Sequence, residues 1–416
     1  MCTSIVVFVS MIISWPIWST KNPLPQPLAG SGCASVGEGD SIYVIGGRDS
    51  PGNRYATNYR YDTFTDTWTT ETSMSTPRAH LGCAAVNGKI YAIGGWVGAA
   101  ATGVVEEYDP TTDTWTTKSP MPTPRYTFSI AVAAGKIYII GGMNPQGQIF
   151  NTVEEYDPLT DTWTVKTPMP TSRMGPGCAA INDTIYVYGG STVIGGGITA
   201  VNECYDPVSD SWATRASMQN ARFALGGFTW GNTAYAIGGY DYSTYIADLD
   251  AYEPATNAWT SLGLSPMQYA RQSIAVALTG YGVYYVYVIG GWNNGALDYN
   301  EEGWFEIGIE EYANTEQQIS LMISPNPFRD FTEISFRNGT NNIDASNISR
   351  PAEVKIYDAT GRLVKDLSHH ISIAGERSTV RWDGYGNHGQ LLPNGAYLLV
   401  LKRGELTTTE KLLLVR

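Results

Sequence analysis

The stretch IYVIGG at residues 42–47 decides the fold, because versions of it return five more times along the chain. The further copies are IYAIGG at 90–95, IYIIGG at 137–142, IYVYGG at 185–190, AYAIGG at 234–239 and VYVIGG at 286–291. Their first glycines lie 47 to 52 residues apart, a period that suits a unit of four short β-strands. One such sheet cannot bury both of its faces, so we expect the units to stack in a closed ring.

A spaced pair of aromatic residues follows each of the first five diglycines. The pairs are Tyr61 with Trp68, Tyr108 with Trp115, Tyr156 with Trp163, Tyr205 with Trp212, and Tyr252 with Trp259. Turn-forming strings such as DPTTDT at 109–114 separate the two residues, because Asp-Pro favours a tight turn. Each pair therefore marks the last two strands of a unit, where the indole and phenol rings pack one sheet on the next.

The sixth unit lacks the tryptophan, and the sequence indicates where its replacement lies. An IEEY string at 309–312 resembles VEEY at 105–108, but no tryptophan follows it. Near the N-terminus, WSTKNPLPQPL from Trp18 lines up with WTTKSPMPTPR from Trp115. We therefore expect the N-terminal segment to supply the outer strand of the last sheet, which closes the ring.

The apolar-Gly-Gly string with its spaced Tyr and Trp resembles the kelch repeat, over roughly residues 17 to 312. The resemblance implies an all-β chain with a six-bladed kelch-type β-propeller closed by an N-terminal strand. Members of this family serve as binding platforms, as sugar oxidases and as sialic acid mutarotases. The fold by itself therefore leaves the function open.

From about Gln318 the repeat stops, and the alternation of apolar residues predicts a small antiparallel β-sandwich, similar to an immunoglobulin-like domain. PNP at 325–327, IYDATGRLV at 356–364 and WDGYGNHGQLLPNGAYLL at 382–399 occur in that order. This order resembles the C-terminal sorting domain of the bacterial type IX secretion system and the related immunoglobulin-like domain of flagellar hook capping proteins. The expected domains are a signal peptide at 1–14, the propeller at 15–316 and the sorting β-sandwich at 317–416.

Composition and the N-terminus bear on partners and location. The formal net charge of −13 argues against binding to nucleic acid or to an anionic membrane. The apolar run from Ile5 to Ile13 is too short to span a bilayer but fits the core of a signal peptide, and no later segment reads as transmembrane. We expect a secreted or outer-membrane surface protein, monomeric, that contacts the secretion machinery through its C-terminal domain.

Few residues offer catalytic or metal chemistry. The propeller has one histidine, His80, whereas the copper-dependent sugar oxidases of the kelch family use two histidines and two tyrosines. The aspartates of each turn are better explained as turn caps than as calcium ligands. Cys33, Cys83 and Cys178 stand in Gly-Cys-Ala strings and are better explained as small core residues than as a metal site. The sequence predicts no catalytic residue, no metal and no cofactor.

The candidate ligand site is a cationic, aromatic bowl at one end of the ring. An arginine precedes the innermost strand of five units, at Arg78, Arg125, Arg173, Arg222 and Arg271, with Leu28 in the sixth place. Among the residues that follow the diglycines, Arg48, Trp96, Tyr240 and Trp292 complete the candidate set. Such groups suit a carbohydrate or a peptide. Alternatively, an arginine that recurs once per unit bonds a loop carbonyl or a neighbouring acid.

The function expected from these features is a non-catalytic binding or adhesion protein that recognises an extracellular carbohydrate or protein ligand. One alternative is a sugar-modifying enzyme such as a sialic acid mutarotase-like propeller. Another is a purely structural surface protein. Clustering of Trp96, Tyr240 and Trp292 on one face would argue against the structural alternative.

Overall fold

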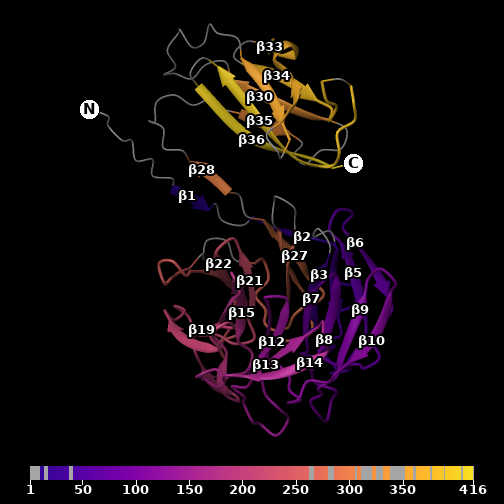
Figure 1. Ribbon diagram of the computed structural model, residues 1–416, viewed down its shortest axis with the longest axis vertical. Helices are drawn as coiled ribbons and strands as arrows, with labels where there is room; N and C mark the ends of the chain where they lie inside the picture. The colour runs from indigo at the N-terminus through magenta and orange to yellow at the C-terminus, as the bar shows by residue number, and fades with distance from the viewer. Residues whose placement is uncertain are drawn as a thin grey trace, which may run out of the picture. The chain divides into compact units, whose positions relative to one another are not determined.

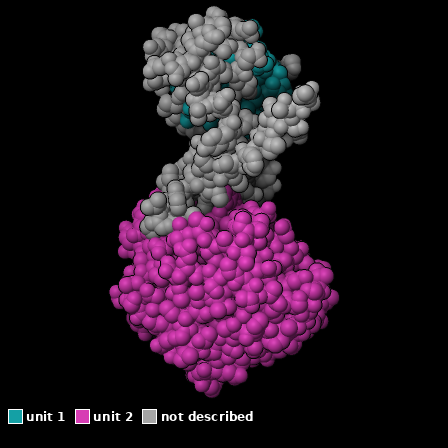
Figure 2. All heavy atoms as spheres, turned by 90° about the vertical axis from the view of Figure 1, so that its left-hand side faces the viewer, with its two compact units in different colours: residues 1–12, 307–416 teal, residues 13–306 magenta. Residues whose placement is uncertain are grey.

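The computed structural model describes residues 10–13, 17–36, 41–261, 267–279, 285–304, 307–310, 321–324, 331–337, 352–358, 362–374, 377–387, 389–403 and 406–415. These residues form strands, turns and one short 3-10 helix, η1 (Ser368–His370). The chain divides into two compact units, shown in different colours in Figure 2. The propeller unit comprises residues 13–306, and the C-terminal unit comprises residues 1–12 and 307–416.

Six four-stranded antiparallel sheets make up the described part of the propeller unit (Figure 1). We number them as blades, each from its innermost strand outward. Blade 1 is β3 (Gly32–Val36), β4 (Ser41–Ile45), β5 (Asn58–Asp62) and β6 (Thr67–Glu71), and blade 2 is β7 (Gly82–Val86), β8 (Lys89–Ile93), β9 (Val105–Asp109) and β10 (Thr114–Lys118). Blade 3 is β11 (Ser129–Ala133), β12 (Lys136–Ile140), β13 (Val153–Asp157) and β14 (Thr162–Lys166).

The remaining three blades repeat this order, with a small hairpin added to blade 4. Blade 4 is β15 (Gly177–Ile181), β16 (Thr184–Tyr188), β19 (Asn202–Asp206) and β20 (Ser211–Arg215), and the hairpin is β17 (Ser191–Val193) with β18 (Gly196–Ile198). Blade 5 is β21 (Gly226–Trp230), β22 (Thr233–Ile237), β23 (Leu249–Glu253) and β24 (Ala258–Ser261). Blade 6 is β25 (Ala275–Thr279), β26 (Tyr285–Ile289), β27 (Asn300–Trp304) and β2 (Ile17–Thr20).

The innermost strands contact one another in a closed cycle. β3 lies beside β7, β7 beside β11, β11 beside β15, β15 beside β21, β21 beside β25, and β25 beside β3. The second strand of each blade, which carries the repeated apolar string, is almost fully buried between neighbouring sheets. Small residues at the start of the innermost strands permit this packing. A Cβ on Gly32, for instance, would lie 2.3 Å from Cys83 Sγ in the next blade.

The last blade is closed by the N-terminal segment, as the alignment of Trp18 predicts. β2 pairs with β27, and Trp18 lies opposite Gly303 as Trp115 lies opposite Tyr108 in blade 2. The prediction that IEEY at 309–312 is the third strand of this blade is wrong, because residues 300–304 (NEEGW) form that strand. The motif is hidden since glycine replaces the tyrosine: a Cβ on Gly303 would lie 3.0 Å from the Trp18 ring.

The turn residues that recur in each blade join neighbouring blades, and blade 2 shows how. The Tyr108 and Trp115 ring centroids lie 5.0 Å apart. Tyr108 donates its hydroxyl to Asp113 at 2.8 Å, and Asp113 accepts the Thr72 amide of blade 1 at 2.9 Å. Trp115 Nε1 donates to the Thr72 carbonyl at 2.7 Å. The turn carboxylate is therefore used within the fold, which agrees with its interpretation as a cap rather than a calcium ligand.

The described part of the C-terminal unit contains two four-stranded sheets. One is formed by β29 (Leu321–Ser324), β30 (Thr332–Arg337), β34 (Arg377–Trp382) and β33 (Ser372–Ala374). The other is formed by β32 (Leu363–Asp366), β31 (Glu353–Tyr357), β35 (Gly395–Arg403) and β36 (Leu406–Leu414). Trp382 is fully buried in their shared core, 5.2 Å from Tyr397 between ring centroids.

The expected signal peptide at 1–14 lies mostly outside the described residues. Residues 10–13 form β1 (Ser10–Ile13), which pairs with β28 (Ile307–Glu310). Among the described residues, no helix has the length and apolar character needed to cross a membrane.

Candidate functional site

The loops that follow the diglycines gather at one end of the ring, which we call the loop face. The first residue of each loop makes a single β-bridge to a residue just before an innermost strand. The bridges join Arg48 to Ala29, Trp96 to Ala79, Met143 to Tyr126, Ser191 to Met174, Tyr240 to Phe223, and Trp292 to Gln272. The structure therefore places Arg48, Trp96, Tyr240 and Trp292 at equivalent positions on one face.

A circle of backbone hydrogen bonds lies directly next to these bridges. Each member donates its amide to the carbonyl of its counterpart in the preceding blade, with N···O distances of 2.6 to 3.2 Å. All six members have a left-handed φ between +51° and +65°. The members are Gly30, His80, Thr127, Gly175, Ala224 and Ser273. Four of them are not glycine, so this geometry costs conformational energy that the closed circle offsets.

Two arginines of the blade 1 loop lie on tryptophans of the neighbouring blades. The Arg48 guanidinium carbon lies 4.4 Å from the ring centroid of Trp292 in blade 6. The Arg54 guanidinium carbon lies 4.0 Å from the ring centroid of Trp96 in blade 2. Arg48 and Arg54 are themselves joined by a β-bridge. Cation–π contacts of this kind fix the planes of both guanidiniums, so the loop spans three blades.

The Asp49 carboxylate lies next to these arginines but already accepts hydrogen bonds from its own loop. Asp49 accepts hydrogen bonds from the Gly52 and Asn53 amides at 2.8 and 2.7 Å, and from the Tyr55 hydroxyl at 2.9 Å. Nε of Arg48 and Nε of Arg54 are both buried without a hydrogen-bond partner in the described part of the chain. Burial and the neighbouring charge of Arg54 lower the pKa of the Arg48 guanidinium. Asp49 opposes this shift, but no described carboxylate forms an ion pair with either guanidinium, so the two arginines make this part of the loop face locally positive.

His80 lies beside this pair, in the backbone circle. Burial and the charges of Arg48 and Arg54 lower the pKa of its imidazole from 6.5 to about 4. His80 is therefore neutral at neutral pH, when it can donate one hydrogen bond and accept one. Its ring lies against the backbone of Gly30, where an added Cβ would approach Nδ1 to 2.6 Å.

A second aromatic group lies in blade 5, around Tyr240. The Tyr240 and Tyr245 rings stack with centroids 4.8 Å apart, and Phe223 and Tyr242 stack at 4.7 Å. Tyr242 reaches Ser191 of blade 4, with 3.5 Å between the two hydroxyl oxygens. Phenol rings and hydroxyls thus continue the aromatic arc from blade 6 to blade 4.

The five recurring arginines do not line a bowl, because all of them are fully buried. Each forms an ion pair with an acid on the third strand of its own blade. The pairs are Arg78 with Glu106, Arg125 with Glu154, Arg173 with Glu203, Arg222 with Asp250, and Arg271 with Glu301. This arrangement is the structural alternative considered from the sequence, and it keeps these five side chains away from a ligand.

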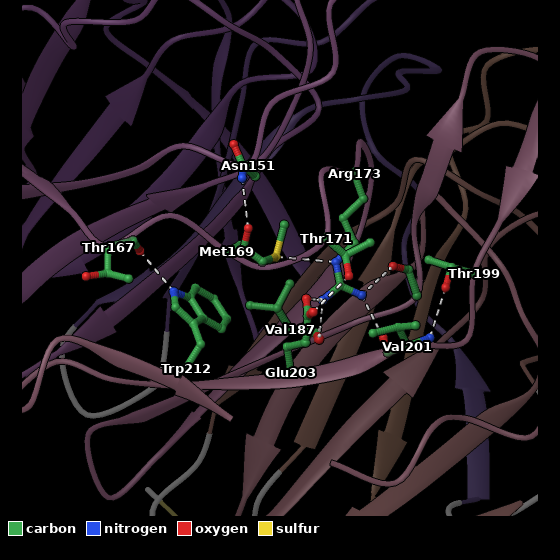
Figure 3. Close-up of polar contacts among 11 residues, drawn as sticks. Asn151, Thr167, Met169, Thr171, Arg173, Val187, Thr199, Val201, Glu203 and Trp212 are labelled. Carbon is green, nitrogen blue, oxygen red and sulfur yellow. Dashed lines mark hydrogen bonds and ion pairs between the residues drawn. The ribbon is translucent and has the colours of Figure 1, made fainter. Parts of the chain in front are cut away.

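Blade 4 shows one such arginine in detail (Figure 3). The Arg173 and Glu203 side chains lie 2.5 Å apart, and Arg173 also donates to the carbonyls of Val187 and Val201 at 3.1 and 2.7 Å. Thr171 donates its hydroxyl to the other Glu203 oxygen at 2.8 Å. Burial lowers the pKa of Arg173 to about 10, with Glu203 opposing the shift, so the guanidinium stays charged at neutral pH.

Two blades depart from this pattern. Blade 1 has Leu28 in place of the arginine and Tyr59 in place of the acid. Both side chains belong to an apolar cluster. Blade 5 has the shorter Asp250, whose Oδ2 lies 2.8 Å from Arg222 Nη2. In the described part of the chain neither Asp250 oxygen accepts a well-aligned hydrogen bond, and Nε and Nη1 of Arg222 have no partner. Blade 5 therefore contains the least satisfied of the buried pairs.

A shallow hollow lies on the loop face between blades 3 and 4. Its volume is about 450 Å³, and its lining residues are Gly147, Ile149, Ser172, Thr192, Val193 and Ile194. Val193 and Ile194, at the end of the β17–β18 hairpin, are 57% and 54% exposed. The face therefore combines a cationic side at blade 1 with an apolar side at blade 4.

Several residues of the face were not expected from the sequence. Arg54, Tyr242 and Tyr245 lie at loop positions that do not repeat, so no period indicates them, and Tyr126 occupies a recurring position whose residue type differs from blade to blade. His80 stands out in the sequence only as the one histidine of the propeller, and no sequence pattern indicates its place in the backbone circle. Among the described residues, no group of three or more His, Cys, Asp or Glu side chains has the arrangement of a metal site.

Comparisons with known proteins agree with this architecture. Residues 1–190 match the KLHDC2/KLHL20/DRC7 Kelch-repeats domain, and residues 172–219 and 221–263 match the Kelch motif. Residues 332–405 match the FlgD Ig-like domain. A solved structure titled "Structure of YjhT" is similar with a TM-score of 0.56 at 16% identity, covering 67% of this chain and 95% of that one. No curated protein sequence matches the chain.

The predicted fold class is confirmed: the chain is all-β, with kelch-repeat domains and an FlgD Ig-like domain at its C-terminal end. At this identity the likeness to the solved structure concerns the fold alone. The match to the FlgD Ig-like domain agrees with the expected flagellar hook capping resemblance.

Proposed function

We propose that this chain of kelch-repeat and FlgD Ig-like domains is an extracellular, non-catalytic binding protein whose loop face recognises a carbohydrate. The observation that carries the proposal is the arc of aromatic and arginine side chains from Trp96 through Arg54, Arg48 and Trp292 to Tyr240. Ring faces and guanidinium forks favour sugars, which present apolar C–H faces and hydrogen-bonding edges. A purely structural surface protein gives no reason for such groups to cluster on one face.

We assign the C-terminal unit a role in export, as a sorting domain of the type IX secretion system. The support is the order of its sequence motifs, together with the match of residues 332–405 to the FlgD Ig-like domain. On this proposal the protein is released from the cell or held at the outer-membrane surface. The test is to remove residues 317–416 and to follow the chain in a bacterium with that system. Retention of the truncated chain in the periplasm is expected, and unchanged export would contradict the role.

The binding proposal is tested with the full chain on an array of neutral and acidic glycans. A bound glycan is then titrated by calorimetry against the wild type, Trp292→Ala and Tyr240→Ala. Each variant is expected to weaken binding by about tenfold or more, because each removes a ring from the arc. Phe64→Ala is the matched control, since Phe64 is 52% exposed in the β5–β6 turn, away from the loop face.

A protein ligand is the second candidate, and the exposed pair Val193 and Ile194 favours it. The two exposed aliphatic side chains lie beside a hollow of mixed polar and apolar lining, which could receive an apolar anchor residue of a protein partner. Binding of a protein that is lost in Val193→Asp and kept in Trp292→Ala would replace the carbohydrate proposal. Turnover of any sugar during the titrations would instead identify the sugar-modifying alternative.

A further inference from the structure

Arg48 and Arg54 differ from every other arginine in the described part of the propeller unit. Residues 13–306 contain nine arginines, and six of these form ion pairs with carboxylates. A seventh, Arg215, donates to Cys204 Sγ at 3.1 Å. Arg48 and Arg54 alone have no such partner in the described residues, although the chain has a net charge of −13. In such an acidic chain, two neighbouring arginines without an ion pair to any described carboxylate need an explanation.

The surroundings of the two arginines leave only their N–H groups for a ligand. The neighbouring indole faces are already covered, Trp292 by Arg48 and Trp96 by Arg54, and Trp96 also stacks on Tyr126. A sugar ring therefore cannot stack on the indole faces that the guanidiniums cover, and at these places the arginine N–H groups are the atoms left to meet a ligand. The stacked indoles instead hold the guanidiniums flat and pre-organised, which lowers the entropy lost when they bind an anion.

We propose that Arg48 and Arg54 together bind the carboxylate of an acidic carbohydrate. This inference rests on the proposed function, because it names the chemical class of ligand for the same face. A planar guanidinium fork matches the two in-plane oxygens of a carboxylate, and two forks neutralise one such group in a half-buried site. Tyr240, Tyr242 and Tyr245 continue the face with rings and hydroxyls, which suit the rest of a sugar better than an extended acidic peptide.

Three small probes separate the parts of this inference: D-galacturonate, its methyl ester and N-acetylglutamate. The methyl ester keeps the sugar but has no charge, and N-acetylglutamate keeps a carboxylate without a sugar. Each probe is titrated into full-length, ¹⁵N-labelled protein, and the Arg48 and Arg54 Nε–H signals are followed after assignment with Arg48→Gln and Arg54→Gln. Galacturonate is expected to shift both signals and to bind at least about tenfold more tightly than its ester.

The variants provide the second measurement. Arg48→Gln and Arg54→Gln are each expected to weaken galacturonate binding by about tenfold or more and to change ester binding little. Arg48→Lys keeps the charge but loses the fork, so an intermediate loss is expected. Arg60→Gln changes the net charge equally, but Arg60 is paired with Glu71 in blade 1, so binding should stay at the wild-type level.

Each outcome decides one question. Equal binding of galacturonate and its ester, unaffected by Arg48→Gln and Arg54→Gln, overturns the carboxylate site but leaves carbohydrate binding intact. N-acetylglutamate binding as tightly as galacturonate overturns the carbohydrate part of the inference. The absence of any Nε–H shift with galacturonate overturns the site, and if the glycan array is also empty, the proposed function fails with it.

Discussion

Arg125 and Arg54 both belong to segments at the loop-face end of the propeller unit, yet their environments are opposite. Arg125 is fully buried and paired with Glu154, whereas Arg54 is half-buried on Trp96 without a carboxylate partner in the described residues. The difference lies in the strand opposite each arginine. The third strand of each of blades 2 to 6 supplies an acid, whereas the acid of the blade 1 loop, Asp49, accepts hydrogen bonds from its own loop and forms no ion pair with Arg54. Each paired arginine fixes the segment before an innermost strand to the third strand of the same blade, whereas Arg48 and Arg54 have no carboxylate partner among the described residues.

The largest expected effect comes from breaking a buried pair. Glu154→Gln leaves the Arg125 charge buried without a counter-charge, which should lower the free energy of unfolding by about 3–5 kcal/mol. Urea unfolding of the full chain measures the change in the propeller transition. The double variant Arg125→Leu/Glu154→Tyr copies the Leu28 and Tyr59 pair of blade 1 and should recover much of the loss. A double variant as unstable as Glu154→Gln would contradict this account.

The next effect is a loss of stability in acid that arises from the burial of His80, with a further contribution from the charges of Arg48 and Arg54. The pKa of His80 is lowered from 6.5 to about 4, so the unfolded chain takes up a proton in this range before the folded chain does. Stability should therefore fall as the pH drops from 6.5 towards 4, with this histidine contributing roughly 2–4 kcal/mol. His80→Asn accepts the left-handed backbone and should reduce the loss, measured as the pH dependence of urea unfolding. An unchanged pH profile in this variant would rule the explanation out.

A smaller effect, of opposite sign, is expected in blade 5. Asp250→Glu lengthens the acid to match the other four pairs and should align it with Arg222, which raises the free energy of unfolding by about 1–2 kcal/mol. The reverse change, Glu154→Asp in blade 3, is the matched control and should be destabilising. If both substitutions lower the thermal midpoint, the length of the acid is not what separates blade 5 from the others.

The smallest effect is expected for an unpaired arginine. Arg54→Gln removes a charge without leaving a buried carboxylate behind, and it relieves repulsion with Arg48. The free energy of unfolding should stay within about 0.5 kcal/mol of the wild type, in contrast to any variant of Arg125. Thermal and urea unfolding provide the comparison. A large loss would mean that Arg54 is a structural residue, like its paired counterparts.

Much of the fold was predictable because its signals recur. The diglycines, the Tyr and Trp pairs and the Trp18 alignment all repeat with the period of a blade. The acid partners of the buried arginines were not predicted, although blade 1, which lacks both the arginine and the acid, contains a signal that could have identified them. Blade 6 concealed its own acid, because Gly303 replaces the tyrosine that would have identified NEEGW as a strand.

The candidate site was less predictable, because its parts come from positions that do not repeat. Trp96, Trp292 and Arg48 were found because they occupy a defined place after a diglycine. Arg54 lies later in its loop, and only the three-dimensional contact with Trp96 connects it to the site. The sequence alone also does not distinguish an arginine in an ion pair from one without a partner, because ion pairing depends on which carboxylates lie next to it in the folded protein.

The β2–β27 pairing has a mechanical consequence. The ring is completed by only four residue pairs, from Ile17 opposite Trp304 to Thr20 opposite Glu301. The chain enters β2 from residues 1–12 and leaves β27 for residues 307–416, which belong to the same C-terminal unit, so tension applied through that unit arrives at blade 6 first. Such tension loads the short pairing and the neighbouring β26–β27 ladder before it reaches any other blade. If the C-terminal unit is anchored and the loop face binds a ligand, blade 6 is expected to unfold first, and its strand pairing then sets the force at which the propeller opens.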